Sequence, residues 1–208
     1  REFMGEVCDA VALRELWIGW DFALGRKREG DARRLGEIGQ ELGYSVHTVE
    51  RVTLGGETVS SSSIRAALEA GDVAKAASML GRPFSVRGEV VAGDRRGRTI
   101  GFPTANIAVE PGHATPSNGV YVCYATVGGA RYGAVTNIGV RPTFDGTKRT
   151  VEAYLLDFTD EIYGEVLKLE FLQRLRGEQK FDGISALVAQ ITRDVAEARA
   201  LLAQRDDT

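Results

Sequence analysis

Cysteine is scarce in this sequence, and the two cysteines present form no pattern. Cys8 and Cys123 lie far apart among 208 residues and show no recognisable metal-ligand spacing. Such usage fits a reducing, cytoplasmic compartment. Cys123 alternates with apolar residues in a strand-like stretch, which predicts a core position rather than a catalytic role.

Long apolar runs and an excess of basic charge are also missing. No apolar stretch approaches the length of a membrane span, no signal peptide is visible, and no internal repeat or low-complexity tract occurs. The formal net charge of -3 gives no general reason to expect nucleic acid as a partner. We therefore expect neither a membrane nor a nucleic acid to be bound, and the sequence leaves the oligomeric state open.

The sequence does contain a change of pattern near Gly81-Arg82-Pro83, which predicts two domains, residues 1–82 and 83–208. Strand-like and helix-like stretches alternate in the first part, as in an α/β domain. The expected elements are a strand at 16–18, a helix at 31–42, a strand at 44–49, a helix capped by serines 60–63, and a helix beginning at Asp72.

After Pro83 apolar residues recur at every second position, which is typical of strands. The expected strands cover 84–90, 120–127, 132–138, 151–158 and 166–172, with Gly128-Gly129 and Asp145-Gly146 as turns. Short strands without helices between them predict a small closed barrel or a sandwich. The C-terminus instead has helical spacing, with an apolar face of Ile184, Leu187, Val188, Ile191, Val195, Ala198 and Leu202. We expect this helix to lie against the barrel.

A glycine-punctuated basic loop at residues 93–101 is predicted to bind phosphate. Glycines let backbone N–H groups approach an anion closely, and the arginines Arg95, Arg96 and Arg98 supply positive charge. The alternative is a mobile, solvated surface loop. As a nucleotide site it would contact ATP through Gly93, Arg95, Arg98, Gly101, Pro103 and Thr104.

The segment that follows this loop offers two side-chain oxygens. Pro103 favours extended backbone for the residue before it, and in an extended chain Thr104 and Asn106 share a face. Mg²⁺ prefers oxygen ligands and usually takes substrate phosphates as its remaining ones. We therefore expect Thr104 and Asn106 to bind Mg²⁺ together with ATP, unless the segment is only an edge strand.

Two further groups of polar residues stand out in the second part. Glu152 shares its strand face with aromatic and aliphatic residues, which is unusual for a carboxylate without a partner or a task. The alternative is an edge-strand glutamate paired with Lys148 or Arg149. A polar run between strands is explained equally well by a turn or by ligand contacts; it comprises Asn137, Arg141 and Thr143.

Five ordered blocks of the second part resemble riboflavin kinases. They are PTAN at 103–106, NGVY at 118–121, NIGVRPTF at 137–144, VEAYLLDF at 151–158 and LRGEQKF at 175–181. The resemblance implies a Greek-key barrel with a C-terminal helix. It also implies that Glu152 is the general base and that Arg176 lies in a loop that closes over the flavin.

The first part resembles the adenylyltransferase half of bacterial bifunctional riboflavin kinase/FAD synthetases, a Rossmann-like nucleotidyltransferase domain. The matching blocks are IGWDF at 18–22, with Gly25, Arg28 and Gly30, and VSSSSIR at 59–65. In that family a serine-rich helix start with a trailing arginine holds nucleotide phosphates, here Ser60, Ser61, Ser62 and Arg65, although a plain helix cap explains the serines alone. The family's His-x-Gly-His motif is missing, and we expect the sequence to lack the first part of a longer protein.

Together these features predict a riboflavin kinase that converts riboflavin and ATP with Mg²⁺ to FMN and ADP. We expect the intact protein also to adenylylate FMN to FAD, and we expect these 208 residues to contain an incomplete adenylyltransferase half. The alternative is a non-catalytic flavin- or nucleotide-binding barrel, which would not need a carboxylate, a Thr/Asn pair and a phosphate loop together.

Overall fold

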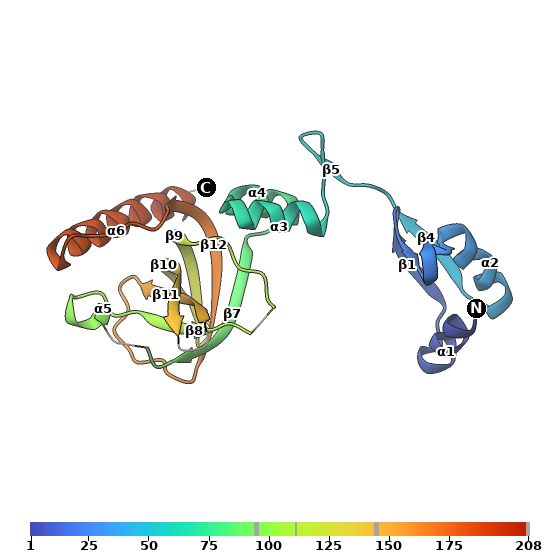
Figure 1. Ribbon diagram of the computed structural model, residues 1–208, viewed down its shortest axis with the longest axis horizontal. Helices are drawn as coiled ribbons and strands as arrows, with labels where there is room; N and C mark the ends of the chain where they lie inside the picture. The colour runs from blue at the N-terminus through green and yellow to red at the C-terminus, as the bar shows by residue number, and fades with distance from the viewer. Residues whose placement is uncertain (94–95, 111, 144–145, 207–208) are drawn as a thin grey trace. The chain divides into compact units, whose positions relative to one another are not determined.

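The computed structural model describes residues 1–93, 96–110, 112–143 and 146–206. The chain forms two compact units, Arg1–Val59 and Ser60–Thr208 (Figure 1). No helix within the described residues combines the length and the apolar composition that a membrane span requires.

The first unit is built around a two-stranded parallel sheet, in which β1 (Glu15–Gly19) pairs with β4 (Ser45–Val49). Helix α2 (Ala32–Leu42) precedes β4, and Asp31 caps it by accepting a hydrogen bond from the N–H of Arg34 at 2.8 Å. The core comprises Met4, Ile18, Leu35, Ile38 and Tyr44. The other elements are α1 (Glu2–Val11), β2 (Ala23–Leu24), the short helix η1 (Arg26–Arg28), β3 (Gly30–Asp31), β5 (Thr53–Leu54) and β6 (Glu57–Thr58). The predicted α/β character is confirmed.

The second unit contains a closed antiparallel barrel. Its strands are β7 (Phe84–Val91), β8 (Ala105–Ala108), β9 (Gly119–Val127), β10 (Ala130–Thr143), β11 (Gly146–Leu155) and β12 (Val166–Arg176), in the order β10-β11-β8-β7-β12-β9. Strands β9, β10 and β11 follow one another as hairpins, and β11 returns beside β8. This is a Greek-key arrangement, as predicted.

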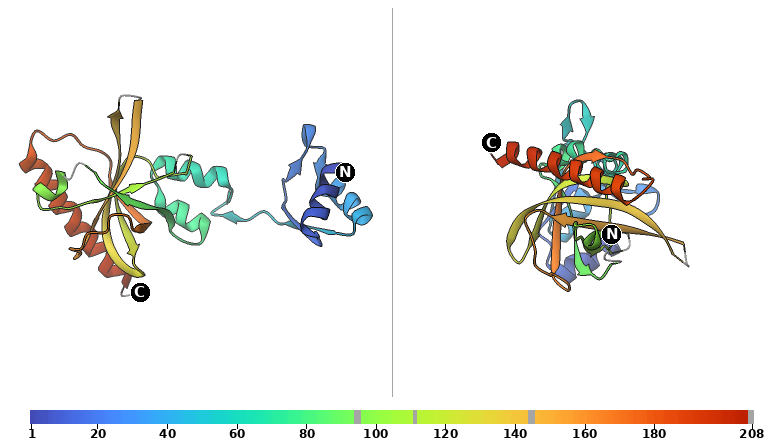
Figure 2. Two further views of the ribbon diagram at one scale, coloured as in Figure 1. Left: turned by 90° about the horizontal axis from the view of Figure 1, so that it is seen from below. Right: turned by 90° about the vertical axis from the view of Figure 1, so that its left-hand side faces the viewer.

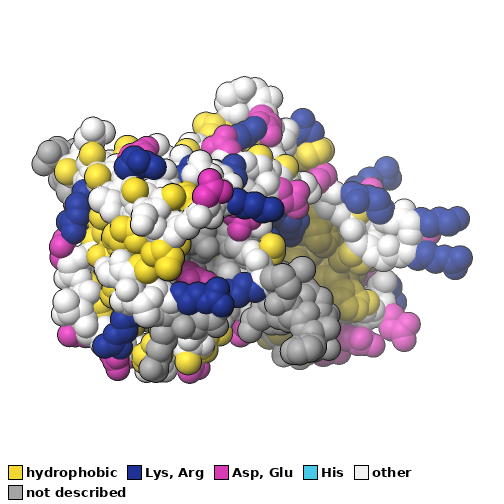
Figure 3. All heavy atoms as spheres, turned by 60° about the vertical axis from the view of Figure 1, so that its left-hand side comes forward, with side chains coloured by type: hydrophobic (Ala, Val, Ile, Leu, Met, Phe, Trp, Pro, Cys, Tyr) yellow, Lys and Arg dark blue, Asp and Glu magenta, His cyan; other side chains and the backbone are white. Residues whose placement is uncertain are grey.

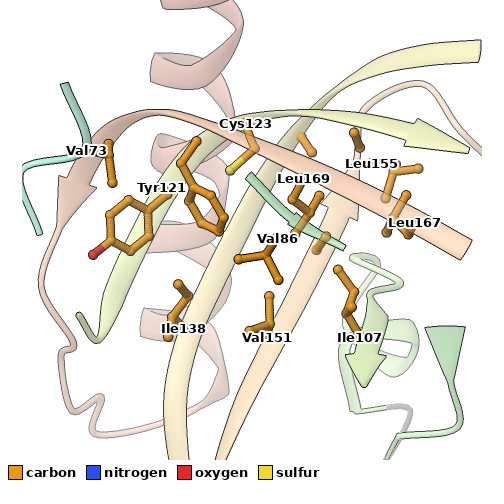
Figure 4. Packing of buried hydrophobic residues seen from close by; sticks show 14 of the residues in the cluster. Val73, Val86, Ile107, Tyr121, Cys123, Ile138, Val151, Leu155, Leu167 and Leu169 are labelled. Carbon is orange, nitrogen blue, oxygen red and sulfur yellow. The ribbon is translucent and has the colours of Figure 1, made fainter. Parts of the chain in front are cut away.

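The alternation along each strand separates the barrel core from its outer face. Ile138 of β10 and Val151 of β11 point into the core, which also contains Tyr121 and Leu169 (Figure 4). Cys123 is fully buried there, as expected, and burial raises the pKa of its thiol to about 12. The intervening residues of β10 and β11 therefore lie on the outer face of the barrel.

Two short helices, α3 (Ser61–Ala70) and α4 (Val73–Leu80), pack against the barrel. Ser60 caps α3 with a reciprocal capping box, and Asp72 caps α4 by accepting from the N–H of Lys75 at 2.9 Å. Their apolar residues join the barrel core, namely Ala67, Leu68, Val73 and Ala76. The compact units therefore divide at Val59, before these helices, and the domain boundary after Arg82 stays a prediction from the change in sequence pattern.

Helix α6 (Ile184–Asp206) lies along the outside of the barrel (Figures 1 and 2). It contacts β9, β10 and β12, and its buried residues Ala198 and Leu202 share a cluster with Val122 and Val135 of the barrel. The predicted apolar face is wrong at its first residue, because the Ile184 side chain is 68% exposed at the start of the helix. Helix α6 thus covers part of the outer face and leaves the rest open.

Candidate active site

The glycine-rich loop packs directly on the Thr/Asn segment. A Cβ at Gly93 would lie 2.6 Å from Cγ and 2.8 Å from Oδ1 of Asn106, and a Cβ at Gly97 would collide with the carbonyl oxygen of Phe102. Position 97 therefore requires glycine, because backbone blocks a side chain there, whereas a side chain at position 93 would displace the Asn106 amide. The same loop contains the single-turn helix α5 (Arg96–Thr99), which precedes β8.

A cavity opens at this junction, and five of the expected ATP and Mg²⁺ residues line it. They are Gly93, Arg98, Pro103, Thr104 and Asn106. The opposite wall is the segment 158–163, which follows β11 and which sequence reasoning missed because it carries no glycine or basic signature. Arg98 spans the two walls through an exposed ion pair with Glu161, in which Nη1 lies 2.8 Å from Oε1.

Two expected nucleotide residues are not among those that line the cavity in the described part of the chain. Arg95 lies outside the described residues. Gly101 is exposed, does not line the cavity, and has a φ of +88°, a backbone conformation that favours glycine. The structure thus brings the glycines 93 and 97, the Thr/Asn pair and Arg98 together, and it leaves Gly101 at the edge of the loop.

Three polar side chains form a row across adjacent strands of the barrel. Glu152 of β11 pairs in register with Asn106 of β8 on one side and with Asn137 of β10 on the other. Residues paired in this way on neighbouring strands present their side chains on the same face. The row therefore places Glu152 beside Asn106 on the same face of the sheet, and of these two residues only Asn106 lines the cavity.

Glu152 has an ion-pair partner within the site. Its Oε1 accepts a hydrogen bond from Nη2 of Arg141 at 2.6 Å, and its side chain is only 20% exposed. The alternative partner Arg149 instead donates to the carbonyl oxygen of Pro116 at 2.6 Å. Among the described residues no hydrogen bond reaches Oε2 of Glu152.

The donor set at the Thr/Asn pair fits Mg²⁺. No described residue hydrogen-bonds to the side chain of Thr104 or Asn106, and both side chains line the cavity. Among the described residues no cluster of three or more His, Cys, Asp or Glu side chains could hold a metal ion. A cation here would therefore use neutral oxygens and the phosphates of a nucleotide, as Mg²⁺ commonly does.

The flavin candidate Arg176 lies at the end of β12, and its guanidinium is engaged by the protein. Nε and Nη2 donate to Asp194 of α6, and Nη1 donates to the carbonyl oxygen of Gly177 at 3.0 Å. The Phe181 ring lies 5.8 Å from the guanidinium carbon. Arg176 therefore secures the segment 177–181 to the helix.

The serine-rich helix start is formed as predicted but lies outside the cavity. The Ser60 hydroxyl accepts from the N–H of Ser63 at 3.1 Å, which satisfies one free donor of α3. Ser61, Ser62 and Arg65 are exposed, and none of these residues lines the cavity. Across the face in Figure 3, the described Lys and Arg side chains are interspersed with Asp and Glu.

Comparison with known proteins identifies the family of this chain. Residues 80–202 match the family model for riboflavin kinase. The chain belongs to the riboflavin kinase family. Residues 1–63 match the model for FAD synthetase, so this family member carries part of a second enzyme module.

The curated relatives of this riboflavin kinase family member are longer proteins. The bifunctional riboflavin kinase/FMN adenylyltransferase of Bacillus subtilis is 38% identical over 95% of this chain and 63% of its own length. Its counterpart in Escherichia coli K12 is 40% identical over 91% of this chain and 60% of its own. The chain thus spans less than two thirds of the length of these relatives.

A solved structure with the same fold covers both units. The crystal structure described as a macrolide-efflux protein from Streptococcus pneumoniae matches with a TM-score of 0.78 and 35% sequence identity, over 88% of this chain and 60% of that one. It therefore supports the fold of each unit taken by itself in this riboflavin kinase family member.

Proposed function

We propose that the chain is a riboflavin kinase that transfers the γ-phosphoryl group of ATP to the terminal ribityl hydroxyl of riboflavin, giving FMN and ADP. The observation that carries this proposal is the register pairing of Asn106 with Glu152 beside the glycine loop. The pairing supports the proposal because phosphoryl transfer needs a metal ligand, here proposed to be Asn106, next to a carboxylate, and a passive binding barrel does not.

Each side chain has a separate task in this proposal. The loop holds the ATP phosphates through Gly93, Arg95, Arg98, Gly101, Pro103 and Thr104, while Thr104 and Asn106 bind the Mg²⁺ that accompanies ATP. When bound, Mg²⁺ neutralises phosphate charge. The open Arg98–Glu161 pair suits this task, because an exposed ion pair costs little to exchange for a phosphate contact.

Glu152 acts as the general base. Its Oε2 accepts the proton of the ribityl hydroxyl as that oxygen forms a bond to the γ-phosphorus and the bond from the γ-phosphorus to the bridging oxygen of ADP breaks. Arg141 holds Oε1, so the carboxylate keeps one oxygen directed away from the guanidinium. Arg176 and the segment 177–181 form the flavin side of the site.

The direct test incubates the chain with riboflavin, ATP and Mg²⁺ and separates riboflavin, FMN and FAD by chromatography. Glu152→Gln should lower the rate of FMN formation by about 10² to 10⁴ while riboflavin still binds. Glu170→Gln is the matched control, because Glu170 is 23% exposed and paired with Lys168 at 2.8 Å on another strand. Near-normal turnover of the Glu152 variant would contradict its assignment as base, and absence of FMN from the unmodified chain would contradict the kinase.

For the whole protein we propose two domains, residues 1–82 for adenylyl transfer and 83–208 for the kinase, with ATP, riboflavin and FMN as small-molecule partners. The serine-rich start of α3 with Arg65 would serve the adenylyl half as a phosphate site. A protein that supplies the His-x-Gly-His motif to this half should continue from FMN to FAD. The same chromatographic assay, run on the 208 residues and on the longer protein, compares the two products.

A further inference from the structure

Asp194 is the only acidic residue buried among the described residues, with 3% exposure. It lies on α6 and accepts three hydrogen bonds from Arg176, two from Nε at 3.0 and 3.1 Å and one from Nη2 at 2.8 Å. Gln190, one helical turn earlier, donates to Oδ1 at 2.7 Å. Removing two charges from water is costly, so a buried ion pair often adds little to the stability of a fold. We therefore asked which part of the structure this ion pair holds in place.

The consequence is the placement of the segment 177–181, which leaves the barrel at Arg176. The guanidinium bound to Asp194 also donates from Nη1 to the carbonyl oxygen of Gly177 at 3.0 Å, and it lies over the ring of Phe181. Both ends of the segment thus meet one side chain, whose position is set by α6. Moving Asp194 would release both ends together.

The middle of the segment reaches the row of polar residues around Glu152. Glu178 Oε2 accepts a hydrogen bond from Nδ2 of Asn118 at 2.9 Å. Its Oε1 lies against Gly139, since a Cβ there would be only 2.9 Å from this oxygen. Gly139 is two residues from Asn137 on β10, and Asn137 is the register partner of Glu152. The segment therefore lies against Gly139 of β10, two residues from the register partner of Glu152.

We propose that Asp194 is a positioning residue for riboflavin: through Arg176 it holds the segment 177–181 in the conformation that binds the flavin. The inference rests on the proposed kinase function and extends it to a helix residue outside the five sequence blocks. If the segment also samples conformations that cannot bind riboflavin, the apparent affinity for riboflavin falls in proportion to the fraction of molecules in the competent conformation. Loss of Asp194 should therefore weaken the binding of riboflavin and leave the nucleotide cavity unchanged, because neither Asp194 nor the segment 177–181 lines that cavity.

Steady-state kinetics of Asp194→Asn test the proposal, with riboflavin and MgATP varied separately. We expect the KM for riboflavin to rise by about tenfold or more, because charge-assisted hydrogen bonds that position the segment are lost. The KM for MgATP and the kcat at saturating riboflavin should stay near those of the unmodified chain. A matched control is Arg199→Gln, which breaks another α6 ion pair, with Asp157 at 2.7 Å, that does not contact the segment.

Two further variants separate positioning from general stability. Glu178→Gln weakens the other attachment of the segment without leaving a buried charge, and it should also raise the KM for riboflavin. In Asp194→Asn combined with Arg176→Gln, the effects on this KM should be less than additive, since both act through one contact. Thermal unfolding of each variant is recorded alongside.

The outcomes are distinguishable from failure of the kinase assignment. If the unmodified chain makes no FMN, the proposed function is wrong. If it makes FMN and both Asp194→Asn and Glu178→Gln keep the normal KM for riboflavin, or Asp194→Asn changes only the unfolding temperature, the positioning role is wrong. Equal changes in the KM values for riboflavin and MgATP would likewise overturn it.

Discussion

Replacing Gly93 by Ala places a methyl group against the amide of Asn106. The new Cβ would lie 2.6 Å from Cγ and 2.8 Å from Oδ1, whereas ordinary contacts of a Cβ begin at 3.4 Å. Gly93 is not among the glycines with positive φ, so alanine fits the backbone and the collision is the main cost. The amide must therefore move by roughly 1 Å, and a displacement of that size in a reacting site costs about 10²-fold in rate.

The assay is kcat/KM for MgATP at saturating riboflavin, which should fall by about 10²-fold in Gly93→Ala. Gly36→Ala is the control, because a Cβ at this position in α2 would meet nothing within 4 Å. In the Asn106→Ala background the collision disappears, so Gly93→Ala should have little further effect. An undiminished kcat/KM in the single variant, or the same loss in both backgrounds, would refute the contact as the cause.

Two other predictions concern the oxygen pair and the buried thiol. Thr104→Val and Asn106→Ala should each raise the Mg²⁺ concentration needed for half-maximal FMN formation, because each removes a proposed protein ligand. Excess Mg²⁺ should partly restore the rate. An unchanged Mg²⁺ titration would mean that the pair only stabilises a turn. Alkylation of the native protein near pH 8 should modify the partly exposed Cys8 and spare Cys123, because burial raises the pKa of the Cys123 thiol to about 12. Peptide mass mapping before and after unfolding checks this. Labelling of Cys123 in the native protein would contradict its burial.

Local features of this fold were predictable from the sequence, because short-range chemistry determines them. Three helices begin at a capping residue, namely Asp31, Ser60 and Asp72. In each case a side chain that can accept a hydrogen bond stands just before apolar residues at helical spacing, which is visible in the sequence. The strands are indicated by apolar residues at every second position, and the C-terminal helix by apolar residues that recur every 3.6 positions. The boundaries were less predictable: β10 and β11 extend as a long hairpin, and the membership of α3 and α4 in the barrel unit depends on tertiary packing.

The site was predictable in its residue types and less so in its pairings. The positions of Gly93, Thr104 and Asn106 follow from one continuous segment, so their proximity could be expected. The Arg141–Glu152 pair instead depends on the register of the β10–β11 hairpin, which residue pattern alone does not determine. The Arg176–Asp194 pair depends on how α6 docks on the barrel, and a buried aspartate resembles a surface one in sequence.

The last prediction concerns Arg141, whose Nη2 donates a hydrogen bond to Oε1 of Glu152, the proposed general base. In Arg141→Ala the carboxylate loses its fixed orientation, and we expect kcat to fall by about tenfold or more, the effect of one charge-assisted hydrogen bond. Arg141→Lys should restore part of the rate, since an ammonium keeps the charge but not the planar geometry. If Arg141 acts through Glu152, the alanine substitution should cost little more once Glu152→Gln is present. A full additional loss in that double variant would mean that Arg141 contacts the substrate phosphates directly.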